Sequence, residues 1–185
     1  MRITKEAVVQ AASDIADADG LSRVSLKVVA EKLNIRTPSL YNHIASLDDL
    51  LREVAHHGMR AMNDLMAHAA IGNSGDKAIK SLSIAYLNYI IAHPGIYETI
   101  QWAHWHGNSE TAEIFDNYKA LIVKLISSCN LKSQKTDEIL SLLMSLLHGY
   151  SSLELGKALM NPEEATKGLI NSIDTVLLGI RAKYD

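Results

Sequence analysis

Several kinds of residue and segment are scarce in this 185-residue chain, and each scarcity removes a class of protein. A single cysteine, Cys129, excludes an intrachain disulfide and fits a reducing compartment. We expect its side chain to be buried as a small apolar group, with redox or ligand sensing as the alternative. No apolar run approaches the roughly 20 residues that span a bilayer, and the first residues lack the basic-then-apolar pattern of a signal peptide. We therefore expect a cytoplasmic protein without a membrane partner.

An excess of positive charge is also missing. The chain has 18 Lys and Arg residues against 21 Asp and Glu residues, a formal net charge of −3, which argues against a general nucleic-acid binder. Even residues 1–52 carry as many anionic as cationic side chains. Any DNA affinity must therefore depend on the local placement of a few cations and on helix N-termini.

Motifs for catalysis and metal binding are absent as well. The sequence has no Gly-x-Ser-x-Gly, no phosphate-binding glycine loop and no His-Glu-x-x-His, so we expect no catalytic residues and no cofactor. Neither the pair His104 and His106 nor the pair His56 and His57 has the i, i+4 spacing that directs two imidazoles to one metal from a helix. No cysteine pair or acidic cluster completes a site, so no metal site is predicted. A metal sensor and an all-helical enzyme remain alternatives.

Helical periodicity runs along nearly the whole chain. Strand-like alternation never persists for more than a few residues, so we predict an all-α fold of about nine helices. One long helix begins at Ser46 and contains Gly58, which indicates either close packing or a pivot between domains. A later helix, 136–159, has apolar residues around more of its circumference than one core could cover. Gly149 on that helix would allow a second helix to approach closely, and the hydrophobic content of 48% favours such extra burial in an oligomer.

The most informative stretch runs from Ser25 to Leu50 and predicts two short helices joined by a tight turn, then a third helix. Ser25 is a candidate N-cap, and Asn34 tolerates the left-handed conformation that ends a helix. Pro38 suits the first turn of the next helix, and Ser46 caps the third. Outside this stretch, Thr4 is predicted to cap the first helix and Ser109 a later one. A helix–turn–helix of this size places its second helix in the major groove of DNA.

The same stretch resembles a known family. The run Leu-x-x-Val-Ala-x-x-Leu-x-Ile-x-x-Pro-Ser-Leu-Tyr-x-His-Ile from Leu26, with the Ala-Ser-Leu-Asp-Asp-Leu-Leu that follows, looks like the signature of TetR-family transcriptional repressors. The resemblance covers roughly residues 1–55. It implies a DNA-binding helix–turn–helix domain over residues 1–46, with three helices, and a helical ligand-binding and dimerisation domain over residues 47–185. It also implies a homodimer, paired through the last two long helices, that binds a double-stranded DNA operator and is released by a small-molecule effector.

Nine side chains of this domain are candidates for contacts with DNA. Arg36 can bind guanine or a phosphate, and Pro38 can touch a thymine methyl group. Asn42 matches a family position that often reads bases, whereas Tyr41 and His43 match positions that mainly hold the DNA backbone. Thr37 and Ser39 can donate hydrogen bonds to phosphates or to either type of base. Ser25 and Lys27 match family positions that approach phosphates from the flank.

One position departs from the family pattern. Many relatives carry a lysine at the place of Leu47, so the sequence lacks one phosphate contact that the family uses. Residues 1–52 also carry no net charge, and the two features together leave an alternative open. The chain would then be a helical small-molecule-binding module whose DNA binding is weak or lost.

A second group of candidate functional residues, aromatic and histidine side chains, lies around residues 97–107. The Trp105-His106-Gly107 triplet resembles a recurring type of regulatory domain in the TetR family. Aromatic and imidazole groups can supply the apolar walls and polar tips of a small-molecule pocket. Alternatively, the two tryptophans fill core and have satisfied indole amides. The candidate ligand-binding residues are Tyr97, Trp102, Trp105, His106, Met144 and His148.

Overall fold

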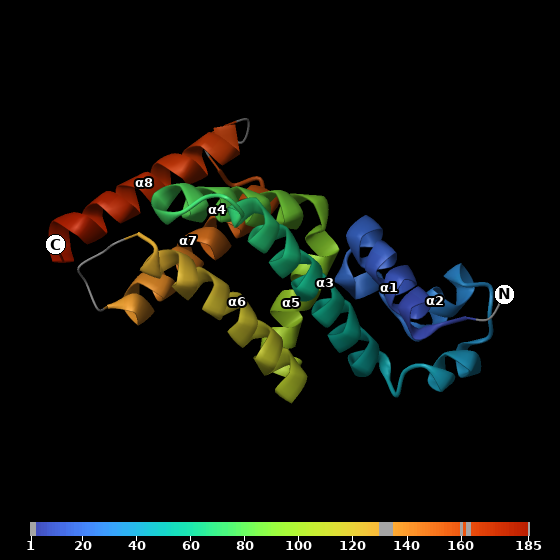
Figure 1. Ribbon diagram of the computed structural model, residues 1–185. Coiled ribbons are helices and arrows are strands. Elements are labelled where there is room, and N and C mark those ends of the chain that lie inside the picture. The colour runs from blue at the N-terminus through green and yellow to red at the C-terminus, as the bar shows by residue number, and fades with distance from the viewer. Residues whose placement is uncertain (1–2, 130–134, 160, 162–163, 185) are drawn as a thin grey trace. The chain divides into compact units, whose positions relative to one another are not determined.

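The computed structural model describes residues 3–129, 135–159, 161 and 164–184, and these residues are helical almost throughout (Figure 1). In the described part of the chain there are no strands, and the prediction of an all-α fold of about nine helices is confirmed. Within those residues, no helix combines the length and the apolar character needed to cross a membrane. The α-helices are α1 (Lys5–Asp19), α2 (Leu26–Lys32), α3 (Leu47–Ala70), α4 (Gly75–Ala92), α5 (Pro94–His106), α6 (Ser109–Ser127), α7 (Thr136–Leu155) and α8 (Ala165–Tyr184), and the short 3-10 helices are η1 (Leu21–Arg23) and η2 (Thr37–Asn42).

The N-terminal helices begin where local side chains satisfy their free amides. Thr4 Oγ1 accepts a hydrogen bond from Ala7 N at 3.2 Å, and Ser25 Oγ accepts one from Val28 N at 3.3 Å. Ser46 Oγ accepts from Asp49 N at 3.0 Å, so the three predicted caps are confirmed. Asn34 has a φ of 53°, the left-handed conformation expected at the turn.

The chain divides into two compact units, one of residues 1–61 and 93–115, the other of residues 62–92 and 116–185. This division reflects packing. The predicted boundary after residue 46 separates DNA binding from ligand binding and dimerisation, and it stays a prediction. Gly58 is buried within the continuous helix α3.

The first unit depends on a close approach between α1 and α5. A Cβ atom on Gly95 would lie 1.9 Å from the carbonyl oxygen of Ala16, so only glycine fits there. The Asp17 carboxylate accepts a hydrogen bond from Ile96 N at 2.9 Å and contacts His93 Nδ1 at 2.8 Å. Glu98 Oε2 accepts from Leu21 N at 3.0 Å. Helix α5 is thus fixed to α1 although the two are far apart in sequence.

The second unit buries the apolar faces of α4, α7 and α8, whose innermost side chains include Leu87, Leu143 and Leu169. The Arg181 guanidinium forms two hydrogen bonds to the Asp76 carboxylate, with Nη1–Oδ2 at 2.9 Å and Nη2–Oδ1 at 2.6 Å. These bonds fix the end of α8 to the start of α4. Cys129 is buried, as predicted, and burial raises the pKa of its thiol to about 11.

Two helix ends differ from the sequence prediction. Ser109 was predicted to cap α6, but Asn108 does so instead, since its Oδ1 accepts from Thr111 N at 3.0 Å. Helix α7 ends at Leu155 rather than at residue 159, because the chain turns at Gly156 and Lys157, and Lys157 has a φ of 53°.

Candidate nucleic-acid interface and regulatory site

The second helix of the helix–turn–helix is the short 3-10 helix η2, and two buried residues hold it in place. Leu40 is fully buried and Ile44 is 3% exposed, as expected for core positions. Pro38 lies in the first turn, and Ser39 N donates to Arg36 O at 2.9 Å. With its apolar side anchored in this way, η2 presents its other side chains to solvent.

Most of the candidate DNA-contacting residues are exposed. Tyr41 is 56% exposed, a large value for an aromatic side chain, and its neighbour Asn42 is exposed as well. Arg36 is exposed and, among the described residues, forms no ion pair. Pro38, Ser39 and Lys27 are also exposed, while Ser25, Thr37 and His43 are half-buried. The roles of these residues in DNA binding stay predictions.

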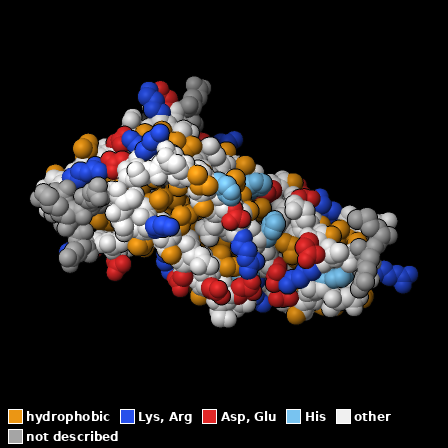
Figure 2. All heavy atoms as spheres, viewed as in Figure 1, with side chains coloured by type: hydrophobic (Ala, Val, Ile, Leu, Met, Phe, Trp, Pro, Cys, Tyr) orange, Lys and Arg blue, Asp and Glu red, His pale blue; other side chains and the backbone are white. Residues whose placement is uncertain are grey.

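Two lysines of residues 1–46 pair with carboxylates of the same segment. Lys32 Nζ lies 3.4 Å from Asp14 Oδ2, and Lys27 Nζ lies 3.9 Å from Glu31 Oε1. On the face shown in Figure 2, cationic and anionic side chains are interspersed rather than separated by sign. Arg36 lies on the N-terminal side of η2 and, unlike these lysines, pairs with no acid among the described residues.

The predicted ligand-binding residues do not form one cluster within either unit. Tyr97 is 6% exposed and packs into the first unit, while Trp105 is 86% exposed. Trp102 stacks on His106 with ring centroids 4.5 Å apart and an interplanar angle of 6°. Met144 and His148 lie on α7, in the second unit. The ligand-binding assignment stays a prediction for all six residues.

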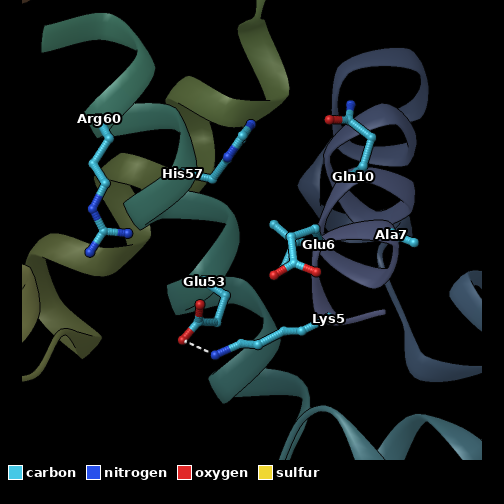
Figure 3. Close-up of a pocket in the computed structure, with 8 residues that line it drawn as sticks. Lys5, Glu6, Ala7, Gln10, Glu53, His57 and Arg60 are labelled. Atoms are coloured by element: carbon cyan, nitrogen blue, oxygen red, sulfur yellow. Dashed lines mark ion pairs between the residues drawn. The ribbon is translucent and has the colours of Figure 1, made fainter. Parts of the chain in front are cut away.

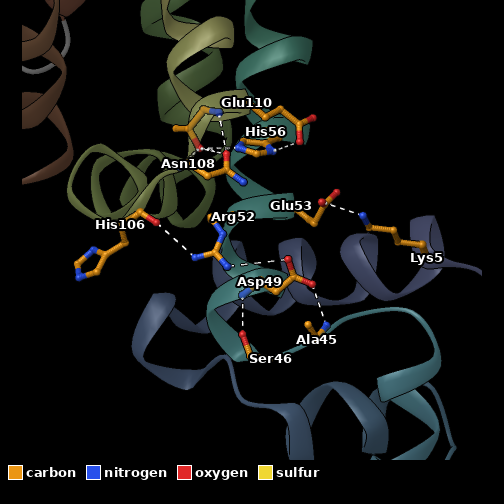
Figure 4. A network of polar contacts seen from close by, with 11 residues as sticks. Lys5, Ala45, Ser46, Asp49, Arg52, Glu53, His56, His106, Asn108 and Glu110 are labelled. Atoms are coloured by element: carbon orange, nitrogen blue, oxygen red, sulfur yellow. Dashed lines mark hydrogen bonds and ion pairs between the residues drawn. The ribbon is translucent and has the colours of Figure 1, made fainter.

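A polar network connects the end of α5 to the first turns of α3 (Figure 4). Arg52 Nη1 donates to the carbonyl oxygen of His106 at 3.4 Å, and Arg52 Nη2 lies 3.9 Å from Asp49 Oδ1. Asp49 Oδ2 in turn accepts from Ala45 N at 2.8 Å, next to the cap of α3. The last turn of α5 is therefore bonded to the segment that leaves the helix–turn–helix.

A second part of this network surrounds a buried histidine, His56, for which the sequence predicted no binding role. His56 is 1% exposed, and its Nε2 lies 2.7 Å from Thr111 Oγ1. Among the described residues its Nδ1 has no hydrogen-bond partner, and it lies 3.6 Å from Glu110 Oε2. Burial lowers the pKa of His56, although the carboxylates of Glu110 and Glu53 oppose this effect.

The sequence analysis predicted no metal site, yet three potential metal ligands meet here. One ligand atom from each of Glu53, His56 and Glu110 lies within 4.8 Å of the other two. The i, i+3 spacing of Glu53 and His56 on one face of a helix is a local signal that could have indicated this pair. Glu110 lies on a different helix, α6, so no local sequence pattern could have indicated it.

A hollow beside this cluster separates α1 from α3 (Figure 3). Lys5 Nζ lies at its rim, 2.7 Å from Glu53 Oε1. The Arg60 guanidinium binds Glu110 Oε1 and holds the pKa of that carboxyl below its ordinary value. The residues that line the hollow are Lys5, Glu6, Ala7, Val9, Gln10, Glu53, His57 and Arg60.

Comparisons with known proteins agree with the architecture. Residues 79–176 match the model of a tetracyclin repressor-like C-terminal domain. The chain is 36% identical over 180 residues to YobS of Bacillus subtilis (strain 168), an uncharacterised HTH-type transcriptional regulator, covering 96% of this chain and 93% of that protein. It is 26% identical to the uncharacterised HTH-type transcriptional regulator Rv0681 of Mycobacterium tuberculosis (strain ATCC 25618 / H37Rv), over 94% of this chain and 75% of that one.

A solved structure supports the fold. A protein of unknown function from Rhodococcus sp. RHA1 superposes with a TM-score of 0.86 at 16% identity, covering 97% of this chain and 96% of that one. The family match, residues 79–176, spans more than half of the chain, and the relative in Bacillus subtilis aligns over 96% of it. The chain therefore belongs to the TetR family of helix–turn–helix transcriptional regulators.

Proposed function

We propose that this protein is a homodimeric repressor that binds a palindromic DNA operator through η2 and is released by a small-molecule effector. One observation carries the DNA-reading part of the proposal. The buried Leu40 anchors η2, and the exposed side chains of Arg36, Tyr41 and Asn42 surround it. An exposed tyrosine beside an unpaired arginine on a helix–turn–helix suits contacts with a polyanion.

Each exposed residue has a role in this proposal. Arg36 binds guanine or a phosphate, and Asn42 reads a base edge in the major groove. Tyr41 and His43 hold the DNA backbone, which fixes the register of η2. Pro38 contacts a thymine methyl group. The flanking phosphates are bound by Ser25, Lys27, Thr37 and Ser39.

Dimerisation through α7 and α8 has its own structural support. Leu142, Leu146, Gly149 and Leu153 follow one another at spacings of four, three and four residues, which places them on one side of α7. Leu142 and Leu153 are 46% and 48% exposed, and apart from the adjacent backbone of α7 no described atom lies within 4 Å of a Cβ built on Gly149. On α8, Leu178 is 65% exposed. A second copy that covers this stripe would bury these side chains.

The contacts of α5 suggest how an effector alters DNA binding. The first turn of α5 is hydrogen-bonded to Asp17 on α1, and its last turn to Arg52 on α3. An effector that displaces α5 therefore acts on both sides of the helix–turn–helix. Because a dimer must match the spacing of two half-sites, a small displacement lowers specific affinity, and coupling of about 1–3 kcal/mol gives a 5–150-fold change.

A gel shift with the intergenic DNA upstream of the gene tests the DNA-reading claim. We expect Arg36→Ala to weaken specific binding about 10-fold or more, since a bidentate base contact contributes about 1–3 kcal/mol. Tyr41→Phe keeps the ring and removes one phosphate hydrogen bond, at a cost of about 1 kcal/mol. The control Lys119→Ala removes the same charge from α6 in the second unit and should leave binding unchanged.

The alternative function, a small-molecule-binding module without strong DNA affinity, is favoured by the internal pairing of Lys32 with Asp14. Under this alternative, neither Arg36→Ala nor Tyr41→Phe changes the gel shift. For the effector site, we expect ligand binding to change the fluorescence of Trp102 or Trp105. Unaltered emission with compounds that release the DNA would place the site elsewhere.

A further inference from the structure

The polar cluster of α3 and α6 contains a buried imidazole nitrogen that makes no hydrogen bond to any described residue. His56 is 1% exposed, and this nitrogen is its Nδ1. Carboxylate oxygens lie close to it: Glu110 Oε2 is 3.6 Å from Nδ1, and one ligand atom from each of Glu53, His56 and Glu110 lies within 4.8 Å of the other two (Figure 4). A buried polar atom beside two acids requires an explanation, because such groups normally have a partner.

The hydrogen bonds on the other side of the ring are compatible with a free lone pair on Nδ1. His56 Nε2 lies 2.7 Å from Thr111 Oγ1, and the direction of this hydrogen bond depends on the tautomer of the ring. In the tautomer with the proton on Nε2, Thr111 Oγ1 accepts from the ring and donates to Asn108 Oδ1 at 3.1 Å. The lone pair of Nδ1 then faces Glu110 Oε2.

In this tautomer a lone pair faces carboxylate oxygens, which is repulsive unless a cation lies between them. A metal ion at this point would satisfy the nitrogen and the acids together.

We propose that Glu53, His56 and Glu110 bind a divalent transition-metal cation of the zinc class. For metal–ligand distances of about 2.1 Å, neighbouring ligand atoms in a tetrahedral site are about 3.4 Å apart. The separation between His56 Nδ1 and Glu110 Oε2 is 3.6 Å, so this edge is already formed. Glu53 lies one helical turn before His56 on α3 and completes the set with a small side-chain movement.

The surrounding residues support the site without occupying it. Lys5 pairs with Oε1 of Glu53, and Arg60 with Oε1 of Glu110, which leaves Oε2 of each carboxylate for the metal. Thr111 orients the imidazole from behind, which is the usual arrangement around a metal-binding histidine.

The chemistry of the ligands selects the cation. An imidazole nitrogen beside two carboxylates suits Zn²⁺ and its neighbours, whereas Mg²⁺ and Ca²⁺ prefer all-oxygen ligands. The three ligands contain no thiolate, so Cu⁺ is disfavoured. With three protein ligands, the fourth position falls to water, and the ion can exchange more readily than in a closed four-ligand site. This inference concerns metal binding alone and does not depend on the proposed function.

Titration of the tag-free chain with Zn²⁺, in competition with a chromophoric chelator, tests the site. We expect one Zn²⁺ per chain and at least a 10-fold loss of affinity in each of Glu53→Gln, Glu110→Gln and His56→Gln. His57→Gln is the matched control, since it removes an exposed imidazole from the same helix and should leave the affinity unchanged. Mg²⁺ at equal concentration should not compete.

The two glutamate variants keep the test decisive even if the buried His56→Gln chain is unstable, because Glu53 is half-buried and Glu110 exposed. Circular dichroism melts of both would verify that they fold. Two results would overturn the proposal: fewer than one Zn²⁺ bound per chain, or an affinity that Glu53→Gln and Glu110→Gln leave unchanged. A loss of binding in His57→Gln alone would overturn it as well.

Discussion

The close contact of α1 with α5 predicts a large effect of adding one methyl group at Gly95. An alanine Cβ there would lie 1.9 Å from Ala16 O and 2.5 Å from Asp17 N, and both contacts are to backbone that no side-chain rotation can relieve. The two backbones must separate by about 1.5 Å to restore an ordinary contact of 3.4 Å. Overpacking of this kind costs about 1–3 kcal/mol, and the separation also strains the hydrogen bond from Ile96 N to Asp17.

We therefore expect Gly95→Ala to lower the free energy of unfolding by about 3 kcal/mol. This sum combines the cost of overpacking with about 1 kcal/mol for the weakened hydrogen bond. Urea unfolding followed by circular dichroism measures this change. The control is Gly179→Ala on α8, where no described atom lies within 4 Å of the new Cβ and helix propensity favours alanine by up to about 1 kcal/mol. If Gly95→Ala is as stable as the wild type, the packing of α5 on α1 is not as described.

Three further predictions concern the second unit. Leu142→Glu places a charge in the proposed dimer face and should convert the dimer to monomer, at a cost of about 3–5 kcal/mol for a buried unpaired charge; analytical ultracentrifugation would detect a persistent dimer if the face is wrong. The Arg181 guanidinium lowers the pKa of Asp76, so the ionised carboxylate contributes stability that is present above about pH 4 and is lost as the pH falls through the lowered pKa. In urea unfolding, the free energy of unfolding should therefore fall more steeply below pH 4 for the wild type than for Asp76→Asn. The difference should be no more than about 1 kcal/mol, because the pair is partly exposed. Parallel plots of stability against pH for the two proteins would contradict the ion pair. Burial raises the pKa of the Cys129 thiol to about 11, so the folded chain keeps a proton that the unfolded chain loses above about pH 9. Stability relative to Cys129→Ala should fall by roughly 1 kcal/mol per pH unit between pH 9 and 11, and a rise would refute the burial of the thiol.

The parts of the fold that depend on near neighbours could be predicted from the sequence. Thr4, Ser25 and Ser46 each bind an amide three residues away, so the residue type and its place before an apolar run were sufficient. The same reasoning gave the wrong cap for α6, because Asn108 and Ser109 are adjacent and both can act as caps. The contact of Asp17 with Ile96 joins residues 79 positions apart, and no local pattern indicates it.

The aromatic cluster illustrates what periodicity can and cannot predict. Ala103 is buried on α5, and Trp105 follows it by two residues, which is about 200° around a helix. Its high exposure could therefore have been predicted once the buried face was known. The sequence could not indicate which face that was, because Tyr97, Trp102 and Trp105 spread apolar side chains around the helix.

The central claim, that η2 reads DNA, is tested most directly by the affinity of the purified chain for the intergenic DNA upstream of its gene. Fluorescence anisotropy should be measured on this duplex and on a shuffled duplex of equal length, over a series of salt concentrations. We predict binding to the intergenic duplex at least about 10³-fold tighter than to the shuffled one, with log K falling linearly against log salt concentration. Equal affinity for the two duplexes, or binding that salt does not weaken, would contradict the account.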